Sequence, residues 1–438
     1  MHASDEHGCA QIRQRRTTAL EPQMNTDKRR YGDGNTTVQR GRLRAGTAKV
    51  EITPTAGIAM CGYGARTQGA EGIHDPLLAR VAVLSDGRTS LAIVSADLVY
   101  LYSERVVTEA RRKWGVDHVI TMGTHTHSGP VLDASGWYSG MEDKVIAAIG
   151  EAAADLFPAR IGMGSGPVDG ECFGYNRRAV GPDGKVSMWW SNRDRKPMGP
   201  TDPVVRVIRI DDERGKPRAV LANYACHPVT LGQENLFISA DFPGPMAARV
   251  EGELGAGCVA MFLQGAGGDV HPYDAVMSGP EGFRCVERNG VSLGSTVLDI
   301  VRRIGPPAET PGAIIKVADR VLRFPFREDA AKTAEAGVMA ALIGDIALAV
   351  IPYEPFVQHQ IDLLKRSPFR KTLFLGYAYF GKGDWLDSYL PTKQAAREGG
   401  YGAAVGSANV LEVGAGERMV DAAVEMIESL RGVDARRA

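Results

Sequence analysis

Short apolar segments typical of buried strands alternate along this chain with segments of helical period, and this alternation constrains the fold more than any other feature. Val81–Leu84 and Leu91–Val94 are predicted strands joined by an Asp86-Gly87 turn, and Ser103–Trp114 is a predicted helix. Further predicted strands are Ala48–Thr53, His118–Met122, Val204–Ile210, Val220–Tyr224, Val259–Leu263 and Ile346–Ile351, and further predicted helices are Met141–Leu156, Pro243–Leu254 with Asp241 as its cap, and Met419–Leu430. This order predicts an α/β fold, with mixed β-sheets flanked by helices in one large domain.

The ends of the chain differ from its middle. The first 45 residues carry nine Arg or Lys against five Asp or Glu and show no apolar periodicity. We therefore predict a disordered basic tail over residues 1–45, one folded domain over residues 46–432 and a short tail over residues 433–438. A basic interaction arm is the alternative interpretation of the first segment.

Charge and composition exclude several classes of protein. The 51 Lys and Arg against 52 Asp and Glu leave no field that would attract a polyanion, so a nucleic-acid partner is not expected. No uninterrupted apolar run reaches the roughly 18–20 residues of a spanning helix, so no membrane anchor is expected. The six cysteines lack CxxC spacing and the amino terminus lacks the apolar core of a signal peptide, which predicts a cytoplasmic protein with reduced thiols.

Histidines follow predicted buried strands at two places. His125 and His127 come after the strand His118–Met122, and in an extended segment both would point to the same side. His227 follows the strand Val220–Tyr224, where a hydrogen-bonded core histidine is the alternative. Imidazoles so placed can bind a divalent metal, or one can bind it while the other donates a proton.

A carboxylate occupies a similar place later in the chain. Glu354 follows the strand Ile346–Ile351 and lies between Pro352 and Pro355, which fix its direction. A solvated turn carboxylate is the alternative. Two histidines and one glutamate at the ends of different strands form a common protein set for hydrolytic zinc.

A glycine-rich turn, Gln264–Pro272, follows the strand Val259–Leu263 but contains neither phosphate-binding glycine pattern. We therefore reject nucleotide binding there. The glycines allow Asp269 and His271 to approach a site closely, and Asp269 is a candidate partner for a ring nitrogen of a metal-bound histidine. A tight turn in which the aspartate bonds its own backbone is the alternative.

Several motifs occur in a fixed order: Gly46-Thr47-Ala48-x-x-Glu51-Ile52-Thr53, Gly62-Tyr63, Gly72-Ile73-His74, Val94-Ser95-Ala96-Asp97, Thr124-His125-Thr126-His127-Ser128-Gly129-Pro130, Tyr175-Asn176-Arg177, Cys226-His227-Pro228, Ile238-Ser239-Ala240-Asp241-x-x-Gly244, Gly268-Asp269-Val270-x-Pro272, Glu354-Pro355-Phe356 and Tyr389-Leu390-Pro391-Thr392. From about Gly46 to about Ala404 the chain thus resembles the amino-terminal catalytic domain of the neutral/alkaline non-lysosomal ceramidase family. The resemblance implies that family's fold in a single catalytic domain.

The resemblance also implies a site. The positions that match the family's ligands for one zinc ion per chain are His125, His227, Glu354 and Tyr389. The positions that match its substrate-contacting or outer residues are His127, Arg177 and Tyr401.

Two departures from the family shape the expected function. His271 stands where ceramidases have a serine proposed to act in catalysis, which excludes a seryl-enzyme mechanism at that position. The chain also stops soon after the catalytic domain, without the family's carboxy-terminal β-sandwich domain, and no secretory signal is recognised. We expect, on this basis, a soluble substrate inside the cell and not an extracellular sphingolipid.

The working hypothesis is a zinc-dependent amidohydrolase that cleaves the C–N bond of a small polar soluble substrate by metal-activated water. His127 and Tyr401 would stabilise the oxyanion or protonate the leaving nitrogen, and Arg177 would orient a polar or anionic group. His271 would add a second proton-transfer group. Trp189-Trp190 would stack a substrate ring beside Asn192, Arg193 and Arg195, unless the two tryptophans only anchor their loop.

Three other functions stay open. An ester or lactone hydrolase would use the same metal site, and a ceramidase proper would follow the family. A non-catalytic binding protein would keep the fold and lose the chemistry. A small-molecule substrate is the expected partner, and a homo-oligomer is compatible with the sequence.

Overall fold

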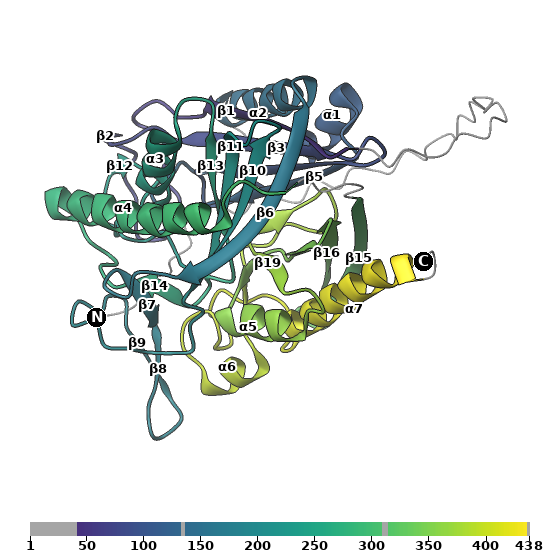
Figure 1. The fold of residues 1–438 in the computed structure, drawn as a ribbon. Coiled ribbons are helices and arrows are strands. Elements are labelled where there is room, and N and C mark those ends of the chain that lie inside the picture. Colours follow the sequence, from purple (N-terminus) through teal and green to yellow (C-terminus); the bar gives the residue numbers. More distant parts are fainter. Residues whose placement is uncertain (1–41, 133–135, 309–313, 436–438) are drawn as a thin grey trace, which may run out of the picture.

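The computed structural model describes residues 42–132, 136–308 and 314–435 (Figure 1). The predicted α/β class with mixed sheets flanked by helices is confirmed. The first strand begins at Arg44, two residues before the expected start of the folded domain, because Leu43 and Ala45 are buried in the core. The rest of the predicted basic tail, residues 1–41, and the last three residues, 436–438, lie outside the described residues.

The largest sheet has nine strands in the order β13-β11-β10-β6-β1-β3-β4-β5-β20. Its parallel pairs are β4 with β5 and β11 with β13, and the other neighbours are antiparallel. β1 and β6 pair over only two residues, so the sheet divides there into two halves. The strands are β1 (Arg44–Glu51), β3 (Leu78–Ser85), β4 (Ser90–Ala96), β5 (His118–Gly123), β6 (Phe157–Pro167), β10 (Val204–Asp212), β11 (Pro217–Tyr224), β13 (Val259–Gln264) and β20 (Ala378–Tyr379).

A second sheet has four strands in the order β15-β16-β17-β19, and shorter pairs of strands carry the loops around the candidate site. The four strands are β15 (Ile315–Pro325), β16 (Thr333–Ile343), β17 (Ile346–Val350) and β19 (Lys371–Leu375). The short strands are β2 (Gly72–Ile73), β7 (Phe173–Asn176), β8 (Arg178–Val180), β9 (Val186–Met188), β12 (Phe237–Ile238), β14 (Val270–Pro272), β18 (Glu354–Pro355) and β21 (Tyr389–Leu390). The strands β6, β15, β16 and β19 are not among those that the sequence predicts.

Seven helices occur in the described residues. They are α1 (Glu104–Trp114), α2 (Gly136–Ala154), α3 (Pro243–Leu254), α4 (Gly279–Ile304), α5 (Val357–Arg366), α6 (Lys393–Glu398) and α7 (Ala415–Ala435). The predicted helices are all present, and Ser103 caps α1 by accepting a bond from Val106 N. The prediction that Asp241 caps α3 is wrong, because Phe242 holds the cap position and Asp241 lies before it with a positive φ. The longest helix, α4, was missed; it carries three glycines between its ends, which weaken a sequence-based helix prediction.

The inner faces of both halves of the large sheet and of the four-stranded sheet meet in one central core. Helices cover the outer faces: α1 and α2 lie over β1 to β5, α3 and α4 over β10 to β13, and α5 and α7 over the second sheet (Figure 1). The candidate site therefore lies among loops from both sheets. These loops follow β4, β5, β11, β13 and β17.

The sequence predicts no membrane-spanning helix and reduced cysteine thiols. Within the described part of the chain, no helix has the length and apolar character needed to cross a bilayer. Cys61 is disulfide-bonded, so the expectation of reduced thiols is wrong for this residue. The free cysteines of the described residues are Cys172, Cys226, Cys258 and Cys285.

Candidate metal centre

His125 lies just beyond β5, in the positive-φ conformation that bulky residues rarely adopt (φ 75°). Its ring is completely buried, and Nδ1 lies 3.0 Å from the carbonyl oxygen of Val99. A carbonyl can only accept, so Nδ1 carries the proton and Nε2 presents its lone pair to the centre.

The ring of His127 meets the ring of His125, but the backbone between them is not extended as expected. The segment is not extended at His125, yet the Nε2 atoms of His125 and His127 lie 3.1 Å apart. The His127 ring packs edge-on against Tyr63, with 5.1 Å between the ring centroids. The predicted meeting of the two rings on one side is observed.

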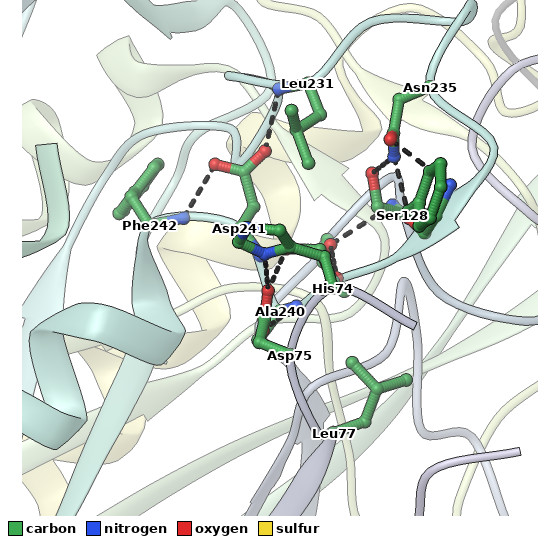
Figure 2. Close-up of polar contacts among 12 residues, drawn as sticks. His74, Asp75, Leu77, Ser128, Leu231, Asn235, Ala240, Asp241 and Phe242 are labelled. Atoms are coloured by element: carbon green, nitrogen blue, oxygen red, sulfur yellow. Dashed lines mark hydrogen bonds and ion pairs between the residues drawn. The ribbon is translucent and has the colours of Figure 1, made fainter. Parts of the chain in front are cut away.

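The loop that carries these histidines is held by the segment before α3 (Figure 2). Ser239 N donates to Ser128 O at 3.0 Å, and Asn235 Nδ2 donates to Ser128 Oγ at 3.0 Å. Asp75 in turn accepts bonds from Ser239 Oγ at 2.6 Å and from Ala240 N at 2.8 Å. This network fixes the Ser128 end of the loop.

His227 follows β11, and its Nδ1 lies 2.5 Å from the carbonyl oxygen of Gly267 in the glycine-rich turn after β13. Nε2 again presents a lone pair, and it has no hydrogen-bond partner among the described residues. Burial is the main cause that lowers the pKa of His227 to about 3, so the ring is neutral at pH 7 and suited to bind a metal.

Glu354 is placed by the parallel pairing of β18 with β21, which puts it opposite Tyr389. Its Oε2 lies 3.3 Å from His125 Nε2 and 3.2 Å from His227 Nε2. Its Oε1 accepts a hydrogen bond from the hydroxyl of Tyr100, which also contacts Asp387 Oδ1 at 3.0 Å. The carboxylate is thus anchored by one oxygen and directed at the two imidazoles by the other.

The chemistry of His125, His227 and Glu354 fits a bound cation. The two Nε2 atoms and Glu354 Oε2 are all acceptors, and acceptors that converge in a buried space repel one another unless a cation lies among them. His125, His127 and His227 also have ligand atoms that all lie within 4.8 Å of one another. The residues therefore fit a divalent metal, and His127, expected outside the ligand set, belongs to the same cluster as the ligands.

Tyr389, Arg177 and Tyr401 lie beside this cluster. The Tyr389 ring stacks near His227, with centroids 6.3 Å apart, and the Tyr401 ring lies 5.6 Å from the Tyr389 ring. Arg177 follows β7 and is completely buried. Its guanidinium carbon lies 5.1 to 5.4 Å from the ring centroids of Trp190, Tyr389 and Tyr401.

The role predicted for Asp269 is corrected by its hydrogen bonds. Asp269 orients no ligand histidine among the described residues, because its oxygens accept bonds from Asn176 Nδ2 at 2.7 Å and Val357 N at 2.8 Å. The backbone carbonyls of Val99 and Gly267 orient the rings in its place.

His271, predicted as a proton-transfer group, contacts the loop of Trp190 and the side chain of Arg177. Its Nδ1 lies 3.3 Å from Trp190 O and its Nε2 lies 2.9 Å from Arg177 Nη1. Both nitrogens therefore contact neighbouring groups, and the proton-transfer role of His271 stays a prediction.

The two tryptophans of the loop that carries Trp189 and Trp190 have different contacts. Trp190 lies against Arg177 and Tyr401, whereas Lys196 Nζ lies over the Trp189 ring, 5.2 Å from the ring centroid. Asn192 and Arg195 mainly close and anchor the loop: Asn192 bonds the backbone of Lys196, and Arg195 pairs with Asp274 at 3.3 Å. Arg193 Nη2 contacts Met277 Sδ at 3.1 Å.

Three tyrosines at the centre were missed as site residues. Tyr100 holds Glu354, Tyr63 packs on His127, and the Tyr377 ring lies 4.3 Å from the His125 ring. The position of Tyr100 just after β4 was the available signal, since polar side chains at strand ends converge in such folds.

Comparison with known proteins identifies a family and similar folds. Residues 43–295 match the family described as neutral/alkaline non-lysosomal ceramidase, N-terminal. The chain is 28% identical over 263 residues to neutral ceramidase A of Dictyostelium discoideum, a match that covers 52% of this chain and 35% of that protein. It is 26% identical over 272 residues to the neutral ceramidase of Mycobacterium tuberculosis, which covers 52% of this chain and 40% of that protein.

The fold is similar to that of the neutral ceramidase from Pseudomonas aeruginosa, with a TM-score of 0.71, 19% identity and coverage of 89% of this chain and 75% of that chain. The matches to the curated relatives span well under half of the length of those proteins.

Proposed function

This chain belongs to the neutral/alkaline non-lysosomal ceramidase family, and on that premise we propose that it is a zinc-dependent amidohydrolase acting on a small polar substrate. The observation that carries the proposal is the convergence of His125 Nε2, His227 Nε2 and Glu354 Oε2 at one buried point. The relatives named neutral ceramidases support hydrolysis of an amide bond.

The metal would be held by His125, His227 and Glu354, with His127 and Tyr389 as further neighbours. A bound Zn²⁺ supplies Lewis-acid polarisation of a carbonyl and lowers the pKa of a bound water toward 7. The chain itself contributes an enclosed site, because the three histidines and Glu354 are fully buried and exclude bulk water.

The remaining groups would bind and orient the substrate. His127 Nε2 and the Tyr401 hydroxyl would donate hydrogen bonds to the developing oxyanion or pass a proton to the leaving nitrogen. Arg177 would bind a polar or anionic part of the substrate next to Tyr389. Tyr100 would keep Glu354 directed at the histidines.

A ceramide substrate is the second candidate, because the matched relatives are named for it. The small polar substrate is preferred because charged and aromatic side chains, Arg177, Trp190 and Tyr401, gather beside the metal ligands. An ester or lactone would react by the same route, so matched amide and ester substrates must be compared.

The test joins metal analysis to a hydrolase screen. The purified full-length chain should contain about one zinc per chain, and chelation should abolish hydrolysis of small polar amides while added zinc restores it. His125→Ala and His227→Ala should lose both metal and activity, whereas His118→Gln, a half-buried histidine at the start of β5, should keep both. If the first two variants kept full metal content and activity, the proposed metal site would be wrong. If the protein cleaved ceramide well and small polar amides not at all, ceramide would take the place of the proposed substrate.

A further inference from the structure

Arg177 lies beside the candidate metal centre, with its guanidinium carbon over three aromatic rings. The rings are those of Trp190, Tyr389 and Tyr401, at 5.1, 5.4 and 5.3 Å. Because Tyr389 stands opposite Glu354 in the β18–β21 pair, the charge of Arg177 lies next to the ligands.

His271 fixes this guanidinium. Arg177 Nη1 donates to His271 Nε2 at 2.9 Å and Nη2 donates to Gly268 O at 3.0 Å. An arginine can only donate, so Nε2 of His271 is an acceptor and the proton is on Nδ1, directed at Trp190 O at 3.3 Å. Burial first, and then Arg177, lower the pKa of His271 well below its usual value, so the ring is neutral.

A neutral histidine is a different partner for arginine from a carboxylate. It fixes the direction of the guanidinium through one hydrogen bond and brings no negative charge of its own. Two successive residues of the glycine turn also act together, since Gly267 O orients His227 and Gly268 O orients Arg177. The distance between a metal ligand and the arginine is thereby set by one short stretch of backbone.

We propose that Arg177, positioned by His271, binds a carboxylate of the substrate next to the scissile bond, so that the substrates are amides bearing a carboxylate, such as N-acyl amino acids. The planar fork of arginine matches a carboxylate, and charge-assisted bonds of this kind are about twice as strong as neutral ones. This inference rests on the proposed function and narrows its substrate class. His271 is then a positioning residue for specificity.

The test compares two amides of equal size, N-benzoylglycine and the neutral N-benzoylglycinamide, with the zinc-loaded full chain and benzoate release as the readout. We expect kcat/KM to be at least about tenfold higher for the carboxylate, because only the carboxylate can accept a charge-assisted hydrogen bond from Arg177. Arg177→Gln should abolish this preference. His271→Phe, which keeps a ring and removes both hydrogen bonds, should raise KM for N-benzoylglycine about tenfold with a smaller change in kcat.

His271→Gln can still accept a hydrogen bond from Arg177 and should restore part of the preference. Lys196→Gln removes the exposed cation stacked on Trp189 and should leave the preference unchanged. Equal kcat/KM values for the two amides in the wild-type protein, or equal losses for both in His271→Phe, would overturn the proposal.

Binding separates this proposal from the proposed function. If neither amide is hydrolysed, calorimetric binding of N-benzoylglycine to the zinc-loaded protein should still exceed that of the neutral amide and should be lost in Arg177→Gln. Carboxylate binding that survives in Arg177→Gln would assign the carboxylate to the metal and overturn the subsite. Absence of carboxylate binding would also overturn the subsite at Arg177. Hydrolysis of both amides at equal rates would overturn this subsite and leave the proposed amidohydrolase function standing.

Discussion

The α-carbon of Gly62 faces the ring of His127 so closely that an added β-carbon would lie 2.6 Å from His127 Cβ. Gly62 also has a φ of 102°, which side chains rarely adopt. We expect Gly62→Ala to displace His127 and lower zinc affinity at least about tenfold, since misplaced ligands and their partners have effects of that size. Zinc titration with a competing chelator measures this.

Gly57→Ala is the matched control for backbone strain. Gly57 has a φ of 89°, but no atom lies within 4 Å of its added β-carbon. Both variants should lose about 1 kcal/mol of stability from the positive φ, and only Gly62→Ala should lose metal affinity. Equal zinc affinities in the two variants would refute the steric argument.

Tyr100 holds Glu354, the proposed carboxylate ligand. Burial raises the pKa of Tyr100 well above its usual value, so its hydroxyl stays protonated and donates to Glu354 Oε1. We expect Tyr100→Phe to fold, to bind zinc about 10–100-fold more weakly and to lose activity in proportion. Tyr379→Phe, whose ring packs on Tyr102, serves as the control and should bind zinc normally. Unchanged zinc affinity in Tyr100→Phe would show that this bond does not orient the ligand.

Tyr377 carries a buried hydroxyl that has no hydrogen-bond partner among the described residues. Removing such a group removes its desolvation cost, so Tyr377→Phe should raise the free energy of unfolding by about 1 kcal/mol. Tyr353 is also buried with a positive φ, but its hydroxyl donates to Asp384 O at 3.1 Å, so Tyr353→Phe should lower stability. Urea unfolding of both variants is the measurement, and opposite signs are expected. A loss of stability in Tyr377→Phe would show that its hydroxyl has a partner.

Asp241 makes stability depend on pH. It is buried between the backbone N–H groups of Leu231 and Phe242, at 3.0 and 2.7 Å (Figure 2), and burial raises its pKa to about 6. Between about pH 4 and pH 6 the folded state keeps a proton that the unfolded state releases, so this group lowers stability as pH rises through that window.

The integrated effect is on the order of 2–3 kcal/mol. Asp241→Asn, which tolerates the positive φ, should remove it. The difference in unfolding free energy between wild type and variant should therefore change in favour of the variant from pH 4 to pH 6. Urea unfolding at several pH values checks this, and parallel pH curves for the two proteins would contradict it.

The local elements were predictable because their signals are local. The hairpin of β3 and β4, the buried strands β5, β11 and β13, and the capped helix α1 follow from apolar periodicity and turn residues within a few positions. The elements that were missed lack such signals. β6 contains three glycines that leave room for Ile300, Ile304 and Arg303 of α4, so its strand character is visible only once that helix is packed on it.

The groups that could do chemistry were recognisable from strand patterns and family motifs: His125, His127, His227 and Glu354 all follow predicted strands and lie in those motifs. The contacts of these groups became known only from the folded chain. Asp269 holds Asn176 and Val357, backbone carbonyls of Val99 and Gly267 orient the ligand rings, and His271 holds Arg177. The physical reason is that hydrogen bonds depend on ångström-scale distances between segments far apart in the chain, and local residue patterns contain no information on those distances.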